Sequence, residues 1–381
     1  MRQPLLTAAL LIAAPLLLPQ MHAQDGKYKV LKTARVGGEG GWDYIYADSA
    51  GRRLYIPRGA VRATDATDRS PATEASPPRL TVFDLDTLAS VNELSGVGGQ
   101  GTAVDPETGH GFTSDHPQIS MFDTKTLTKL KSIDVGDARP DGILFDAFSK
   151  RVYVFSHPTK NATVIDAKYG TVVGTIDLGG VPEEGVADGN GMLYVVIQDP
   201  VGSVTAVELK SMKAVGHYSL VDMGSCNGLA LDVKNSVLFA ACNRPSPPAG
   251  QPSNAGPGTG QSEAAMVVLS AKDGKVLAKL PLAGRSDGAV FNPATMEAFS
   301  TGGNGTLTVV KEKTPVTFEV EQVLNTMNGA RTIALDTKTG HVLTMSQERN
   351  SPPSGAATSP SGRPPVGSTV PGSFTILMIG K

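Results

Sequence analysis

The sequence predicts an all-β protein: a seven-bladed β-propeller of four-stranded antiparallel blades, closed by its N-terminal strand. Three observations predict this fold. One pattern of residues occurs seven times, most copies are separated by about 42 residues, and turn formers are abundant, with 43 Gly and 27 Pro among 381 residues. Repeats of about 40–45 residues that each supply four short strands are typical of propeller blades.

Each copy has a polar residue, a short apolar run that ends in an anchoring Asp or Asn, a turn, and a second apolar run. The anchors are Asp48, Asp105, Asp146, Asp188, Asp232, Asn292 and Asp336. A further hairpin follows in each unit, as in Thr81–Leu88, where apolar and polar residues alternate. The last copy ends one strand short, and Tyr28–Arg35 has no blade of its own. We therefore expect this N-terminal strand to close the ring and remove an exposed sheet edge.

The chain begins with Met1-Arg2, an apolar run from Leu5 to Leu18, and small residues near Ala23. This order is typical of a cleaved secretory signal peptide, which we place at residues 1–23. Residues 24–381 then form one propeller domain, predicted to be a soluble periplasmic or secreted monomer. Segments rich in Pro, Ser, Gly, Ala or Thr at 61–78, 245–264 and 350–372 are predicted as flexible insertions between the second and third strands of their blades.

Charge and motifs exclude several function classes. Lys and Arg number 34 against 36 Asp and Glu, a net charge of −2, and no block of basic residues occurs. The electrostatic signature of nucleic-acid binding is therefore missing, and we expect no nucleic-acid partner. No nucleophile elbow, zinc-protease motif or phosphate-binding loop is present, so no catalytic residue is predicted.

The residue five positions before each anchor is polar in every copy. Because innermost strands converge on the propeller axis, these side chains are expected to ring the mouth of the central channel. The ring consists of Asp43, Gln100, Asp141, Glu183, Asn227, Asp287 and Arg331. Two interpretations remain open: a solvated rim around a water-filled channel, or a ligand site that could take Ca²⁺ or another divalent cation.

A second alignment places His116, His157 and Asp199 eleven residues after their anchors, and a proline follows each of them. Two imidazoles and a carboxylate suit a transition metal, whereas the alternative is that these dipeptides only turn the chain.

The two cysteines are predicted to form a disulfide. Cys226 begins the innermost strand of the fifth blade and Cys242 ends the next strand, so an antiparallel hairpin brings both to one end. A loop of this length is stabilised by about 3 kcal/mol when closed. The competing interpretation is a reactive thiol pair.

The repeats resemble those of the YVTN-repeat, YncE-like bacterial propellers. The resemblance extends from Gly41-Trp-Asp-Tyr44 through Arg139-Pro-Asp-Gly142 and Gly180-Val-Pro-Glu183 to Gly372-Ser-Phe-Thr375. It implies the fold and export, whereas the family has no agreed common activity. Family members commonly carry His where this chain has Gln100.

Three functional hypotheses follow. The first is a binding or scaffolding module that takes a small ligand or a periplasmic protein on its insertion-bearing face. The second is a lactonase-like hydrolase that holds Ca²⁺ through Glu183, Asn227 and Asp287. The third, suggested by the resemblance, is an accessory subunit of a periplasmic oxidoreductase.

Overall fold

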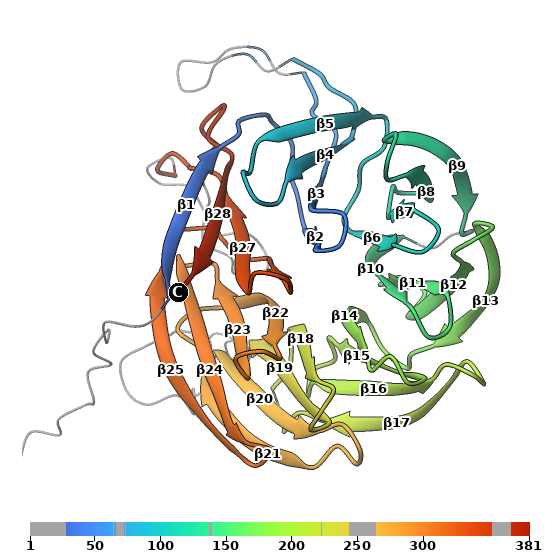
Figure 1. Cartoon of the computed structure of the whole chain (residues 1–381), viewed down its shortest axis with the longest axis vertical. Helices are drawn as coiled ribbons and strands as arrows, with labels where there is room; N and C mark the ends of the chain where they lie inside the picture. Colours follow the sequence, from blue (N-terminus) through green and yellow to red (C-terminus); the bar gives the residue numbers. More distant parts are fainter. Residues whose placement is uncertain are drawn as a thin grey trace, which may run out of the picture.

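The computed structural model describes residues 28–63, 65, 72, 74–136, 139–221, 223–243, 264–352 and 367–381. Seven four-stranded antiparallel sheets form a ring, and the described residues contain no helix (Figure 1). The predicted all-β propeller is therefore confirmed. The predicted signal peptide and the central parts of the three predicted insertions lie outside the described residues.

Each blade starts with its innermost strand. Blade 1 contains β2 (Tyr46–Asp48), β3 (Arg53–Arg58), β4 (Arg79–Asp84) and β5 (Ser90–Ser95). Blade 2 contains β6 (Thr102–Asp105), β7 (His110–Thr113), β8 (Gln118–Asp123) and β9 (Thr128–Asp134). Blade 3 contains β10 (Pro140–Asp146), β11 (Arg151–Ser156), β12 (Asn161–Asp166) and β13 (Thr171–Asp177). Blade 4 contains β14 (Pro182–Ala187), β15 (Met192–Ile197), β16 (Ser203–Glu208) and β17 (Lys213–Ser219).

The remaining blades follow the same order. Blade 5 contains β18 (Cys226–Asp232), β19 (Val237–Asn243), β20 (Ala264–Ser270) and β21 (Val276–Pro281). Blade 6 contains β22 (Ser286–Asn292), β23 (Glu297–Gly302), β24 (Thr306–Thr314) and β25 (Thr317–Asn325). Blade 7 contains β26 (Ile333–Asp336), β27 (His341–Ser346), β28 (Thr375–Gly380) and, as its outer strand, β1 (Lys29–Arg35).

The N-terminal strand closes the ring as predicted. In Figure 1 the blue β1 lies beside the dark red β28, and the two pair antiparallel from Lys29 opposite Gly380 to Arg35 opposite Thr375. Just before β1, the backbone N–H of Tyr28 donates to Gln322 Oε1 at 2.9 Å, and Gln322 Nε2 donates to the Tyr28 carbonyl at 2.8 Å. The first described residue is thus held by blade 6 as well as by blade 7.

The anchors of the repeat terminate the innermost strands. The carboxylate of Asp48 accepts the backbone N–H of Gly51 at 2.8 Å, and that of Asp146 accepts the N–H of Ser149 at 2.8 Å. A short side-chain acceptor that satisfies the backbone of the following turn explains why Asp or Asn recurs there. Both anchors are buried, since the apolar strands on either side pack between blades.

The apolar core consists of clusters between neighbouring blades. Leu54 and Ile56 of blade 1 pack with Leu343 and Met345 of blade 7, and Val204 of blade 4 belongs to the cluster that includes blade 5. Each blade therefore buries its faces only when both neighbours are present.

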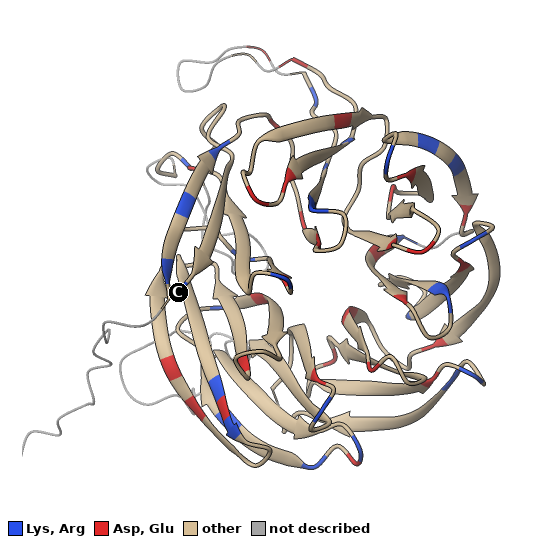
Figure 2. Ribbon diagram, in the orientation of Figure 1, with Lys and Arg blue, Asp and Glu red and all other residues tan. Residues whose placement is uncertain are grey.

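Basic and acidic residues are scattered around the ring in Figure 2.

The starts of the innermost strands and the links between second and third strands lie at the same end of the antiparallel sheets. The three long links join β3 to β4, β19 to β20 and β27 to β28. Two of them are held at their bases by isolated bridges, Val61 with Ser76 and Arg349 with Thr369. The face that carries the long links is therefore also the face on which the channel mouth opens.

Candidate functional site at the channel mouth

All seven predicted ring residues line one pocket of about 350 Å³. Tyr44, Arg139, Pro140, His157 and Gln198 complete its wall. Counting back from the anchors thus located the ring, but it did not place these five additional residues at the pocket.

Local backbone irregularities aim the ring residues into the pocket. The pairing of the first and second strands shifts register between Pro140 and Ile143 in blade 3, and at the matching place in blades 4, 5 and 6. Such bulges re-aim side chains at the end of a strand. The residue after the ring position is often Gly: a Cβ on Gly228 would lie 2.5 Å from the Gly288 carbonyl carbon. Glycine here lets neighbouring innermost strands approach closely.

Blade 4 departs from this pattern with Glu184 at the glycine position. Its Oε2 accepts the backbone N–H of Leu229 at 2.9 Å and that of Ala289 at 3.3 Å. Burial raises the pKa of Glu184 to about 8, while these two N–H donors lower it. This carboxyl therefore links blades 4, 5 and 6 around the axis, a role that the repeat pattern did not indicate.

One side of the pocket, which we call the arginine half, consists of Arg331, Asp43, Asp287, Gln100 and Asn227. Arg331 lies 2.7 Å from Asp287 Oδ2 and 3.6 Å from Asp43 Oδ1. Asn227 donates to Asp287 at 3.0 Å and Gln100 donates to Asp43 at 3.1 Å. Burial raises the pKa of Asp43 to about 7, although Arg331 opposes the shift. The carboxylates here already have a permanent cation between them.

The other side, which we call the histidine half, consists of His157, Asp141, Glu183, Tyr44 and Gln198. His157 Nε2 lies 2.8 Å from Asp141 Oδ2 and 3.2 Å from Glu183 Oε1. The Tyr44 hydroxyl donates to Glu183 Oε2 at 2.7 Å, and Gln198 Nε2 donates to Oε1. Hydrogen bonding to Asp141, then to Glu183, raises the pKa of His157 to about 10, whereas burial raises that of Glu183.

Two acceptor oxygens of the pocket have neither a hydrogen-bond donor nor an ion-pair partner, whereas a third, Asp287 Oδ2, is ion-paired with Arg331. Asp141 Oδ1 and Asn227 Oδ1 are buried and receive no hydrogen bond from the described part of the chain. Asp141 is only 9% exposed, so bulk water has little access to it. A buried acceptor left without a donor is costly, which makes these oxygens candidates for contact with a ligand.

The proposed trio of His116, His157 and Asp199 does not come together. Only His157 lines the channel pocket; His116 is exposed, and Asp199 lines a separate cavity. The reason is that the turn between the first and second strands is one residue shorter in blade 4 than in blade 3. In blade 3, Asp146 pairs with Arg151, five residues later. In blade 4, the backbone N–H of Asp188 donates to the carbonyl of Met192, four residues later. The counterpart of His157 is therefore Gln198, and counting from the anchor misaligned Asp199 by one residue.

The hypothetical lactonase set is divided between the two halves. Asn227 and Asp287 are hydrogen-bonded to each other, and Arg331 ion-pairs with Asp287. Glu183 instead contacts Tyr44 and His157.

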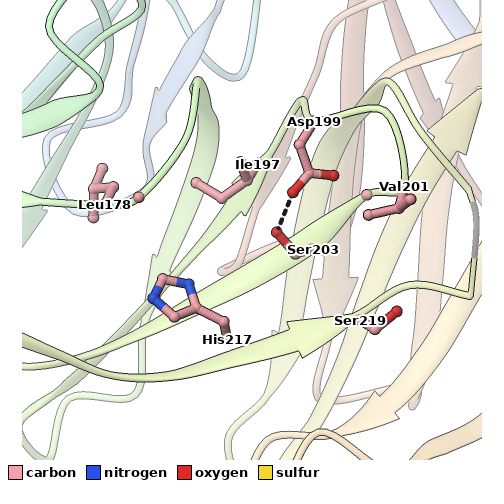
Figure 3. Close-up of a pocket in the computed structure, with 9 residues that line it drawn as sticks. Leu178, Ile197, Asp199, Val201, Ser203, His217 and Ser219 are labelled. Carbon is pink, nitrogen blue, oxygen red and sulfur yellow. Dashed lines mark hydrogen bonds between the residues drawn. The ribbon is translucent and has the colours of Figure 1, made fainter.

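A second cavity of about 370 Å³ lies in blade 4, beside the end of blade 3 (Figure 3). Within it, Ser203 Oγ donates to Asp199 Oδ2 at 2.8 Å, and His217 Nδ1 lies 3.0 Å from Thr205 Oγ1. Thr205 in turn donates to the Leu178 carbonyl at 2.8 Å. These contacts tie Asp199 and His217 to the wall of this cavity, and Asp199 Oδ1 is buried without a hydrogen bond from the described residues.

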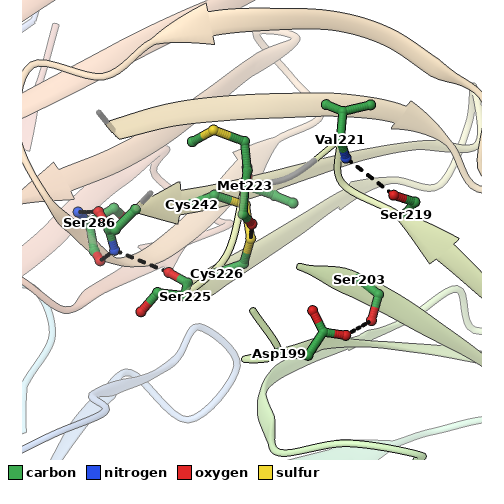
Figure 4. The surroundings of a disulfide bond; sticks show 11 residues. Asp199, Ser203, Ser219, Val221, Met223, Ser225, Cys226, Cys242 and Ser286 are labelled. Carbon is green, nitrogen blue, oxygen red and sulfur yellow. Dashed lines mark hydrogen bonds between the residues drawn. A yellow bond between two sulfur atoms is a disulfide. The ribbon is translucent and has the colours of Figure 1, made fainter. Parts of the chain in front are cut away.

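The predicted disulfide is confirmed (Figure 4). Cys226 and Cys242 are bonded, are directly opposite each other in the β18–β19 pair, and are both fully buried. Asn243, next to Cys242, accepts the N–H of Ser286 at 2.9 Å and donates to its carbonyl at 2.7 Å. The bridge therefore lies where blade 5 meets blade 6: Cys226 directly precedes ring residue Asn227 in blade 5, and Ser286 directly precedes Asp287 in blade 6.

No protein-family model matches the chain, and no curated protein matches its sequence. Solved structures do match. A chain of Kuenenia stuttgartiensis hydrazine synthase aligns with a TM-score of 0.66 and 16% identity, over 87% of this chain and 96% of that one. A chain of a mitotic checkpoint complex aligns with a TM-score of 0.62 and 9% identity, over 90% and 96%. At identities of 16% and 9%, the likeness establishes one thing, that the chain has the β-propeller fold of both structures.

No helix among the described residues is long and apolar enough to cross a membrane.

Proposed function

We propose that this protein is an exported binding module of the YVTN-repeat, YncE-like type, whose channel-mouth pocket takes a small, positively charged ligand. One observation carries the proposal. Four carboxylates of the ring line a single pocket, and the buried Asp141 Oδ1 and Asn227 Oδ1 have no donor among the described residues. A cation, or a ligand that brings N–H donors on a positive group, is the kind of partner that such buried acceptor oxygens lack.

The position of the pocket supports a binding role. It opens on the face that carries the links from β3 to β4, β19 to β20 and β27 to β28, which are the longest links of the ring. Loops on a rigid scaffold are where binding residues concentrate. The same face is thus suited to contact a protein partner around an occupied pocket.

A buried disulfide supports export. Cys226 and Cys242 are both inaccessible to solvent, and structural disulfides persist in oxidising compartments such as the periplasm. Mass spectrometry of the protein recovered from the periplasm tests this part of the proposal. A mass that includes residues 1–23, or a cytoplasmic location, would contradict it.

The binding proposal is tested by calorimetry and thermal shift with a panel of divalent cations and small organic ammonium compounds. We expect at least one compound to bind with one-to-one stoichiometry and to bind at least tenfold more weakly to Asp141→Asn. Asp199→Asn, in the second cavity, is the matched control and should leave affinity unchanged. Absence of binding by both classes of compound would contradict the proposal.

An accessory role in a larger enzyme is the second candidate. It is favoured by one observation, that a chain of the same fold occurs in a solved hydrazine synthase. Stoichiometric co-purification of an enzyme from the native source would support it, and recovery of a free monomer would count against it.

A further inference from the structure

The histidine half contains three potential metal ligands that are already close together. His157 Nε2, a carboxylate oxygen of Asp141 and one of Glu183 all lie within 4.8 Å of one another. Two of the separations are 2.8 and 3.2 Å. Zinc bonds of about 2.0–2.2 Å at tetrahedral angles place ligand atoms about 3.3–3.5 Å apart. To admit an ion, the shorter contact of His157 would have to open by about half an ångström, and the two carboxylates, which lie within 4.8 Å of each other, would have to take up the tetrahedral spacing.

We propose that Asp141, His157 and Glu183 hold one divalent first-row transition-metal ion of the Zn²⁺ class at the channel mouth. The inference rests on the proposed function, because it names the cation that the pocket would take. Asp141 and His157 come from blade 3 and Glu183 comes from blade 4, so the ion would join two blades.

A second observation points to a ligand here, independently of the cluster. Asp141 is nine-tenths buried, yet its Oδ1 has no hydrogen-bond partner among the described residues. After a small rotation of the Asp141 side chain, either of its carboxylate oxygens, Oδ1 or Oδ2, could bind the ion. The unused acceptor is then explained as a metal ligand rather than as an unsatisfied group.

The surrounding residues fit the role of an outer coordination shell. Tyr44 donates to Glu183 Oε2 at 2.7 Å, and Gln198 donates to Oε1. Donors of this kind fix the orientation of a ligating carboxylate in metal sites. Both come from outside the ligand set, Tyr44 from blade 1 and Gln198 from the end of β15.

The donor chemistry selects the class of ion. An imidazole nitrogen with two carboxylates suits Zn²⁺ and its neighbours, whereas Ca²⁺ and Mg²⁺ prefer oxygen ligands only. The arginine half is unsuitable, because Arg331 already lies between Asp43 and Asp287. Three protein ligands leave at least one coordination position for water or for an exchangeable ligand from the pocket.

The test uses the full mature chain, freed of purification tags and dialysed against a chelator. Zn²⁺ and Co²⁺ are titrated by calorimetry and against a chromophoric indicator, with Ca²⁺ as the comparison ion. We expect one Zn²⁺ or Co²⁺ per chain, a Co²⁺ visible spectrum typical of tetrahedral or five-coordinate sites, and much weaker Ca²⁺ binding. His157→Gln, Asp141→Asn and Glu183→Gln should each weaken Zn²⁺ binding by at least 100-fold.

Two controls keep the result interpretable. His116→Gln removes an exposed imidazole and Asp199→Asn removes a carboxylate of the second cavity; both should bind Zn²⁺ within threefold of the wild type. Circular dichroism and melting temperature identify any variant that fails to fold. Absence of stoichiometric Zn²⁺, or an equal loss in His116→Gln, overturns the inference.

The outcome also separates this inference from the proposed function. If no transition metal binds but an organic ammonium compound does, and Asp141→Asn abolishes that binding, the cation pocket stands and the metal site falls. If neither class binds, both proposals fall.

Discussion

The two halves of the channel mouth use the same position of the repeat but neutralise its carboxylates differently. In the arginine half the cation is Arg331, which is itself a ring residue; guanidinium groups stay charged in proteins. In the histidine half the cation is His157, which lies outside the ring, after β11, and can give up its proton. One half is thus permanently occupied by a cation, and the other can exchange its cation.

Removal of the permanent cation should have the largest effect on stability. Arg331→Met leaves Asp43 and Asp287 facing each other in a largely buried site, so we expect the free energy of unfolding to fall by about 2–3 kcal/mol at pH 8. The pKa of Asp43 is already raised to about 7 and rises further without Arg331. Protonation therefore relieves the repulsion as the pH falls, and the loss should be smaller at pH 5.5.

Urea unfolding of Arg331→Met at both pH values measures this difference, with Arg331→Lys as the control that keeps the charge. An equal loss at pH 8 and pH 5.5 would show that Arg331 acts through packing rather than through its charge.

Loss of a fixed neutral donor should have an intermediate effect. Tyr44→Phe removes the hydroxyl that donates to Glu183 Oε2, which we expect to cost about 1.5 kcal/mol. The pKa of Tyr44 is raised well above its usual range by burial, so the hydroxyl remains a donor throughout the neutral range. Urea unfolding should give the largest difference from the wild type where Glu183 is ionised, and the difference should shrink as the pH falls, because the Tyr44 hydroxyl lowers the pKa of Glu183. Tyr169→Phe, an exposed tyrosine, is the control.

Removal of the exchangeable cation should give the smallest effect, with its own pH dependence. The folded-state pKa of His157, about 10, lies above its unfolded value, so its stabilisation is complete below about pH 6.5 and is lost as the pH rises through 10. Because the side chain is 36% exposed, we expect only about 1 kcal/mol. In chelator-treated samples, the difference between wild type and His157→Gln should shrink between pH 7 and 10. Parallel stability curves would contradict this assignment.

The fold and the ring were predictable because both depend on short-range patterns. An anchor such as Asp146 is recognisable from its own apolar run and turn, and the ring residue Asp141 follows by counting back along one strand. Closure by the N-terminal strand followed from a missing strand in the last copy. None of these steps required knowledge of contacts between blades.

The division into halves was not predictable, because it depends on such contacts. His157 meets Glu183 across two blades, and Tyr44 reaches Glu183 from blade 1. Counting from the anchor also paired His157 with Asp199, because the count ignored the shorter turn of blade 4. Aligning the ends of the second strands, Ser156 and Ile197, would have matched His157 with Gln198.

Closure of the ring by β1 and β28 has a consequence for synthesis of the chain. Among the described residues β1 is made first and pairs with β28, which is made last, so this ring cannot be complete until Gly380 has been made. Throughout elongation β1 carries an open sheet edge, a feature that promotes pairing between nascent chains. A circular permutant that joins residue 381 to residue 28 and opens the chain between β21 and β22 would build every blade from consecutive strands, so that no strand waits for the end of the chain to pair.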